Sequence, residues 1–269
     1  MPEKTDHAPG EPCWAELTTP DVEATERFYD ALFGWSIPAT EQSEQFSGYR
    51  QAFQGERPVG GVMPQMQGGP PPAWTTYFAV ADADTVAGLV SEAGGTVIAE
   101  PMDVGDLGRM AVFTDPTGAA FGVWQAGSFG GSAVVQEHGA PTWSELGTRD
   151  VEAARAFYAK VFDWRFEDRE YERGTYTRIS AAGEPFGGMV DITERTPPEI
   201  PAHWLVYFAA DDAEATVTRA KESGGEIPAG PFEISEVGTI AVIKDPGGAF
   251  FAIIQPDPRM QGDDSPARR

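Results

Sequence analysis

The sequence predicts an α+β fold of two tandem domains, each a pair of βαβββ modules whose strands form a curled sheet around a cleft. Three observations support this prediction. The first half of the chain returns in the second half, a strand-then-helix pattern occurs twice in each half, and turn-forming residues stand at the junctions between elements. The chain of 269 residues is long enough for two domains of ordinary size.

The repeat is visible residue by residue. Trp-Ala-Glu-Leu at 14–17 returns as Trp-Ser-Glu-Leu at 143–146, an offset of 129 residues. Tyr-Phe-Ala at 77–79 returns at 207–209, an offset of 130. We therefore expect a first domain over 11–126 and a second over 140–256, joined by a Gly- and Ser-containing linker over 127–139. A flexible N-terminus over 1–10 and a disordered tail over 257–269 complete the predicted organisation.

The first module begins with a strand over 12–20, and Asp21 is the expected N-cap of the helix that follows. Apolar residues then recur at helical spacing up to Leu32, and Gly34 is expected to end the helix. Strand-like stretches follow at 46–54 and 58–63, before a loop at 68–72 that is rich in Gly and Pro.

The same pattern restarts in the second module. A strand over 75–80 precedes Asp82, which is expected to cap a helix that ends at Gly94 and Gly95. Strands near 96–100, 109–114 and 119–125 complete the unit, so the chain holds four such modules.

Composition excludes several classes of function. The formal net charge is −23, with 42 acidic and 19 basic residues, and such a surface repels nucleic acids and anionic membranes. Apolar runs are too short to span a bilayer, and the start lacks the pattern of a secretory signal. Cys13 is the single cysteine. We expect a cytoplasmic protein, a monomer or homodimer, whose partner is a small molecule and not nucleic acid or a membrane.

The paired modules, the Asp-Val-Glu-Ala helix start and the Asp-Pro-Thr-Gly turn at 115–118 resemble the vicinal oxygen chelate superfamily. That superfamily includes glyoxalase I, extradiol dioxygenases and bleomycin-resistance proteins, and the tandem form is similar to glyoxalase-like actinobacterial members. The resemblance covers residues 11–256 and implies clefts that, in metal-dependent members, hold a divalent ion on strand residues.

The positions that would hold the ion do not carry metal-binding side chains. They fall on Trp14, Thr75 and Gly122 in the first repeat, and their copies are Trp143, Leu205 and Ala252. The three histidines, His7, His138 and His203, are expected in loops or on the surface. We therefore predict that neither cleft binds a metal ion or another cofactor.

Strand alternation predicts what the clefts contain instead. It places Trp14, Glu16, Thr75, Tyr77 and Trp124 in the first cleft. Trp143, Glu145 and Tyr207 take the matching places in the second cleft. Arg109 is expected to add a cation to the first cleft, where the copy has Thr239. The aromatic residues also suit plain core packing, and each Glu could be paired with an Arg or reach the rim.

Two kinds of function follow. The first is sequestration of an aromatic or polycyclic small molecule in a metal-free cleft, as in resistance proteins of the superfamily. The alternative is a metal-independent lyase, isomerase or hydroxylase-type enzyme with Glu16 or Glu145 as general base. A third interpretation keeps a metal-dependent glyoxalase-like lyase or dioxygenase. Because of Arg109, the first cleft is expected to bind the polar ligand and the second to support the assembly or take a more apolar compound.

Overall fold

The computed structural model describes residues 4, 6–171, 174–181, 183–235 and 237–257. The tail expected to be disordered lies outside these residues, apart from Asp257. The first repeat contains β1 (Pro12–Thr19), α1 (Val22–Phe33), β2 (Trp35–Ser36), α2 (Glu41–Gln45), β3 (Arg50–Gln54), β4 (Arg57–Pro64), β5 (Ala73–Ala79), α3 (Ala83–Glu92), β6 (Thr96–Val104), β7 (Gly108–Thr114) and β8 (Ala120–Ala126). The second contains β9 (Pro141–Thr148), α4 (Val151–Phe162), β10 (Arg165–Tyr171), β11 (Gly174–Ser180), β12 (Pro185–Asp191), β13 (His203–Ala209), α5 (Ala213–Glu222), β14 (Glu226–Ile234), β15 (Gly238–Lys244) and β16 (Phe250–Pro256).

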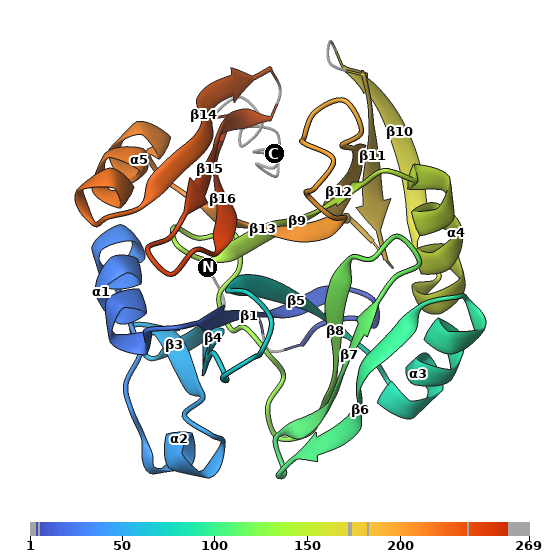
Figure 1. The fold of residues 1–269 in the computed structure, drawn as a ribbon, viewed down its shortest axis with the longest axis horizontal. Helices are drawn as coiled ribbons and strands as arrows, with labels where there is room; N and C mark the ends of the chain where they lie inside the picture. The colour runs from blue at the N-terminus through green and yellow to red at the C-terminus, as the bar shows by residue number, and fades with distance from the viewer. Residues whose placement is uncertain (1–3, 5, 172–173, 182, 236, 258–269) are drawn as a thin grey trace, which may run out of the picture.

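Each repeat forms one eight-stranded sheet, and the two sheets have the same topology (Figure 1). The order in the first sheet is β2-β3-β4-β1-β5-β8-β7-β6, and in the second it is β10-β11-β12-β9-β13-β16-β15-β14. The first strands of the two modules, β1 and β5, pair antiparallel at the centre, and each pairs parallel with the last strand of its own module. The predicted α+β fold of paired βαβββ modules is confirmed.

The expected helix caps explain where the helices begin. The side chain of Asp21 accepts a hydrogen bond from the backbone N–H of Ala24, and Asp82 does the same for Thr85. Gly34 adopts a left-handed conformation, with φ of 70°, at the end of α1. In the second repeat Asp163 takes this left-handed position, with φ of 56°.

The hydrophobic core is shared between the two repeats. One core cluster joins α1 and its strands to α5, β13, β15 and β16, and the other joins α3, β5, β7 and β8 to α4 and its strands. Helix α1 accordingly lies beside α5 and α3 beside α4, as Figure 1 shows. The first module of each repeat thus buries its helix against the second module of the other repeat.

Two matching hydrogen-bond chains cross this shared core. The indole of Trp74 donates to the Tyr29 hydroxyl (2.9 Å), which donates to the Asp245 carboxylate of the other repeat (3.1 Å). Trp204, Tyr158 and Asp115 form the same chain with distances of 2.8 and 3.0 Å. The two Asp residues also accept hydrogen bonds from backbone N–H groups of their own Asp-Pro turns, so each turn is fastened to the other repeat.

The two repeats differ most between their first helix and the strand that begins near Tyr49 in the first repeat and near Tyr176 in the second. In the first repeat Pro38 follows the short β2, and Thr40 and Ser43 exchange side-chain-to-backbone hydrogen bonds at the start of α2. In the second repeat the corresponding segment forms β10, which pairs with β11 along its whole length. The residue pattern of this segment gave no indication of α2.

The described part of the N-terminal segment packs against the rest of the protein. His7 is 8 % exposed and its Nε2 lies 3.0 Å from the Ser132 carbonyl oxygen, which differs from the expected surface location. Gly10 donates its N–H to the Ala79 carbonyl, and Gly139 donates to Ala209 in the same way. Within the described chain, all helices are too short and too polar to cross a membrane.

Candidate ligand-binding clefts

The inner face of the first sheet brings four of the predicted site residues together at its centre. Trp14 lies opposite Tyr77, and Glu16 lies opposite Thr75, in the antiparallel pair of β1 and β5. Because neighbouring residues of a strand point to opposite faces, these four side chains share one face. Gly61 on β4 and Gly122 on β8 stand beside Glu16 and Tyr77 in the same sheet.

Hydrogen bonds tie these aromatic rings to the carboxylate. Tyr77 donates its hydroxyl to Glu16 Oε1 at 3.4 Å, and Trp14 Nε1 donates to the hydroxyl of Tyr49 at 2.9 Å. A Cβ at Gly61 would overlap the Tyr49 hydroxyl and a Cβ at Gly122 would overlap the Tyr77 ring. The two glycines therefore provide the space that the phenol rings occupy.

Burial dominates the electrostatics of the first cleft. It raises the pKa of Glu16 to about 7, although the hydrogen bond from Tyr77 acts in the opposite direction. Burial and the neighbouring Glu16 also raise the pKa of Tyr77, so its phenol stays protonated at neutral pH. Glu16 can therefore exchange a proton near neutrality, while Tyr77 acts as a hydrogen-bond donor.

The second cleft repeats this arrangement and adds positive charge. Tyr207 donates to Glu145 Oε1 at 3.1 Å, and Trp143 donates to the Tyr176 hydroxyl at 2.8 Å. Burial raises the pKa of Glu145, while hydrogen bonds from the two phenols and the nearby charges of His203 and Arg195 lower it.

The first cleft is covered by two segments of its own repeat. Phe129, just after β8, packs edge-on against Trp14 with ring centroids 5.0 Å apart, and it also contacts Trp124. Phe46, just after α2, reaches the β6–β7 turn on the opposite side of the curled sheet, where a Cβ at Gly105 would lie 3.8 Å from its ring. Trp14, which Phe129 contacts, is only 8 % exposed, whereas Trp143 in the second cleft is partly exposed.

Arg109 does not bring a cation to the first cleft. Its guanidinium bonds Asp84 on α3 and Asp103 on β6, at 2.8 Å each, on the helix-covered face of the sheet. The adjacent Met110 is the residue that packs with Trp14 and Tyr77. Strand alternation explains the correction, because Arg109 pairs with Gln125 and Met110 pairs with Trp124, so Arg109 and Trp124 point to opposite faces.

Sequence reasoning missed several residues of the clefts. Tyr49 and Tyr176 complete the two hydrogen-bonded groups, and Phe129 covers the first cleft. Arg195 and His203 act on the pKa of Glu145 in the second cleft. The sequence does contain a repeat that marks the two tyrosines as matching residues. Gly-Gly at 60–61 returns at 187–188, an offset of 127, and Tyr49 and Tyr176 share that offset.

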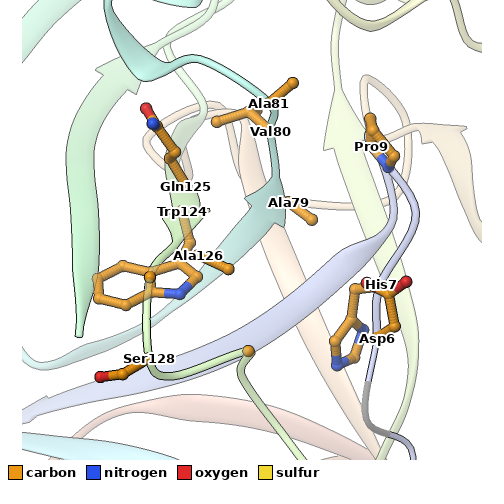
Figure 2. Close-up of a pocket in the computed structure, with 12 residues that line it drawn as sticks. Asp6, His7, Pro9, Ala79, Val80, Ala81, Trp124, Gln125, Ala126 and Ser128 are labelled. Carbon is orange, nitrogen blue, oxygen red and sulfur yellow. The ribbon is translucent and has the colours of Figure 1, made fainter. Parts of the chain in front are cut away.

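A separate cavity of about 550 Å³ lies beside the first cleft, between the N-terminal segment and the ends of β5 and β8 (Figure 2). His7 and Trp124 stand on opposite sides of it, and Gln125 and Ser128 line it as well. Burial is the main cause that lowers the pKa of His7, so its ring is neutral at physiological pH. The cavity adjoins the first cleft through Trp124 and Ala79, which belong to both.

Comparison with known proteins agrees with this geometry. The sequence profile described as the glyoxalase/bleomycin resistance protein/dioxygenase superfamily matches residues 13–123 and 140–253. The chain belongs to this superfamily. The resemblance found in the repeated motifs is thereby confirmed, and the glyoxalase profile falls once on each repeat.

Relatives cover nearly the whole chain. A Mycobacterium tuberculosis protein named "Putative glyoxylase CFP32" is 39% identical over 264 residues, which are 97% of this chain and all of the relative. The anthracycline biosynthesis protein DnrV of Streptomyces peucetius is 38% identical over 270 residues, covering 93% of this chain and 95% of the relative.

Solved structures share the fold at low sequence identity. The 2,3-dioxygenase LapB of Pseudomonas sp. KL28 matches with a TM-score of 0.65 and 12% identity, covering 94% of this chain and 96% of LapB. A Mn(II)-bound glyoxalase of Novosphingobium aromaticivorans matches with a TM-score of 0.63 and 14% identity, covering 96% and 92%.

The residues of this glyoxalase-superfamily chain do not fit a bound metal ion. At the centre of the first cleft Glu16 is accompanied by two protonated phenols and by Gly61 and Gly122, which have no side-chain donor. In the second cleft Glu145 is accompanied by the protonated phenols of Tyr176 and Tyr207 and by Gly188, and His203 is the one further side chain near it that could bind a metal among the described residues. In the part of the chain that the structure describes, no three His, Cys, Asp or Glu side chains gather where they could hold an ion.

Proposed function

We propose that the protein binds an aromatic or polycyclic small molecule in a cleft of the sheet without a metal ion. One observation carries the proposal. In both repeats a carboxylate accepts a hydrogen bond from a phenol and stands beside an indole, on the inner face of a curled sheet. Rings suit a flat apolar ligand, and the carboxylate can accept a hydrogen bond from a ligand hydroxyl.

The names of two relatives support this choice of ligand. DauV and DnrV, 37% and 38% identical to this chain, are named for anthracycline biosynthesis. Anthracyclines are polycyclic aromatic compounds with ring hydroxyl groups, which is the chemistry that an indole, a phenol and a carboxylate together can recognise.

Calorimetric titration with a dihydroxyanthraquinone tests the proposal. We expect saturable binding that is unchanged by a metal chelator, and at least tenfold weaker binding by the double variant Glu16→Gln, Glu145→Gln, since a hydrogen bond to a charged group contributes about 1.5–3 kcal/mol. The matched control is Glu137→Gln, which removes a carboxylate that pairs with Arg57 away from the clefts. Absence of binding, or binding that the chelator abolishes, would reject the proposal.

A second candidate is a metal-independent lyase, isomerase or hydroxylase-type enzyme. The pKa of Glu16, raised to about 7, favours it, because a general base acts best when its pKa lies near the working pH. In such an enzyme Glu16 takes a proton from the ligand and Tyr77 donates a hydrogen bond. Single-turnover mass spectrometry of the bound compound separates the candidates: a changed mass or isomer that Glu16→Gln prevents identifies an enzyme, and recovery of unchanged compound identifies a binding protein.

A further inference from the structure

We infer that the second cleft is the ligand-accepting site, and that it takes a neutral aromatic compound with a hydroxyl group next to a carbonyl oxygen. The inference rests on the proposed function and assigns it to one repeat. It reverses the expectation based on Arg109, which the structure places on the other face of the first sheet.

Access differs between the clefts. The first contains Phe129 against its indoles, and the α2 segment bridges its two rims through Phe46 and Gly105. In the second repeat the chain runs from α4 directly into the β10–β11 hairpin, with no helix among the described residues between them. A flat molecule can therefore reach Trp143 without displacing a helix, whereas Trp14 is already covered.

The wall of the second cleft is apolar and still partly exposed. Partly exposed side chains surround the buried Tyr207 and Ala252, and they are Trp143, Leu205, Ile234, Val237 and Ile254. In the first cleft the positions of Leu205 and Ile254 hold Thr75 and Trp124, and the Trp124 indole is engaged with the Phe129 carbonyl at 2.8 Å. An aromatic ligand would therefore desolvate partly exposed apolar side chains in the second cleft, whereas the two indoles of the first cleft already contact Phe129.

Polar groups at the second cleft define the ligand. Glu145 offers a carboxylate acceptor beside Tyr207, which suits a ligand hydroxyl. His203 begins β13 opposite Gly147 on the same face, and Arg195 lies against Gly174 of the β10–β11 hairpin, 3.6 Å from where its Cβ would be. Arg195 contributes a positive charge that acts on Glu145, and a positive charge at this end favours the electron-rich oxygen of a carbonyl. The net charge of −23 disfavours ligands that are themselves anionic.

Filling each cleft separately tests the assignment. Leu205→Trp and Thr75→Trp place an indole at matching positions beside Glu145 and Glu16. With a dihydroxyanthraquinone as probe, we expect one site per chain, loss of affinity of at least about tenfold in Leu205→Trp, and less than about twofold change in Thr75→Trp. Unsubstituted anthraquinone keeps the carbonyl oxygens and lacks the hydroxyls, and it should bind at least about tenfold more weakly, because it displaces water from Glu145 without donating a hydrogen bond in its place.

The outcomes separate the two proposals. Loss of binding in Thr75→Trp but not in Leu205→Trp would overturn the assignment and leave the proposed function standing. No binding of either anthraquinone would reject both. Hydroxyl-radical footprinting of the unmodified protein adds a readout that needs no ligand and no substitution. Trp143 should react faster than Trp14, and equal or reversed rates would contradict an open second cleft.

Discussion

The two clefts share a polar centre and differ at their rims. Each centre has a carboxylate, a phenol that donates to it and an indole that donates to a second phenol. The first rim adds α2 and Phe129, whereas the second adds β10, His203 and Arg195. The duplicated strands thus reproduce the chemistry, and the segments between them decide which cleft a ligand can enter.

In the shared core, unlike at the rims of the clefts, the two repeats are equivalent. Trp74, Tyr29 and Asp245 form the same chain as Trp204, Tyr158 and Asp115, and all six side chains are buried. Substitutions in the core should therefore have equal effects in the two repeats, and substitutions in the clefts should not.

The largest expected effect is in the core. Tyr29→Phe and Tyr158→Phe each leave a buried indole N–H and a buried carboxylate oxygen without their partner, at a cost of roughly 1–3 kcal/mol for each group. Denaturant unfolding should show equal losses of stability in the two variants. A loss in only one of them would break the equivalence of the two repeats.

A smaller loss of stability is expected at Gly122 and Ala252, where the two sheets differ beside the phenol rings of Tyr77 and Tyr207. Gly122→Ala places a methyl group into the buried Tyr77 ring, and such overpacking costs about 1–3 kcal/mol. The reverse change at the matching position, Ala252→Gly, should cost only about 0.5–1 kcal/mol, the usual effect of glycine within a strand. Thermal unfolding compares the two, and a neutral Gly122→Ala would show that Tyr77 is not held by Gly122.

The pH dependence of stability should distinguish the two carboxylates. The folded-state pKa of Glu16, about 7, lies above its ordinary value of 4.5, so its contribution to stability is fully present below pH 4.5 and is lost as the pH rises towards 7. Glu16→Gln should therefore unfold at a higher denaturant concentration than the unmodified protein at pH 8, with little difference at pH 4.5.

Glu145→Gln should also stabilise the folded protein at pH 8, by a smaller amount than Glu16→Gln. Two phenols, His203 and Arg195 all favour the charged form of Glu145, and they offset part of the burial that raises its pKa. Denaturation curves of both variants at pH 4.5 and pH 8 measure the difference. A larger gain in Glu145→Gln would mean that the second cleft is the drier of the two.

The smallest effect on stability is expected from opening the first cleft. Phe129→Ala removes edge-on contacts with Trp14 and Trp124, and aromatic pairs of this kind contribute about 0.5–1.5 kcal/mol. The variant should expose Trp14 to hydroxyl-radical labelling and leave the labelling of Trp143 unchanged. Unaltered labelling of Trp14 would show that α2 closes the first cleft by itself.

The fold could be predicted from the sequence because most of its elements occur twice, once in each repeat. Asp21 and Asp82 cap their helices as expected, and alternation along β1 and β5 placed Glu16 and Tyr77 on one face. The predicted central residues of both clefts are brought together by the structure.

The rims could not be predicted in the same way. Arg109 was assigned by its position near the start of a strand, and only the pairing of β7 with β8 shows which face it takes. Phe129 lies outside the strands, and Tyr49 precedes β3 although the expected strand over 46–54 included it. Helix α2 forms with local hydrogen bonds of Thr40 and Ser43 in a segment whose copy is a strand. Periodicity records neither such local hydrogen bonds nor contacts between distant segments.

A crystal structure of the protein with a bound dihydroxyanthraquinone, grown in the presence of a metal chelator, tests the central claim most directly. The compound should lie in the second cleft against Trp143 and Tyr207, with a ring hydroxyl within hydrogen-bond distance of the Glu145 carboxylate. A compound found in the first cleft or in the cavity beside His7, or one that binds only when a metal ion is supplied, would contradict the account.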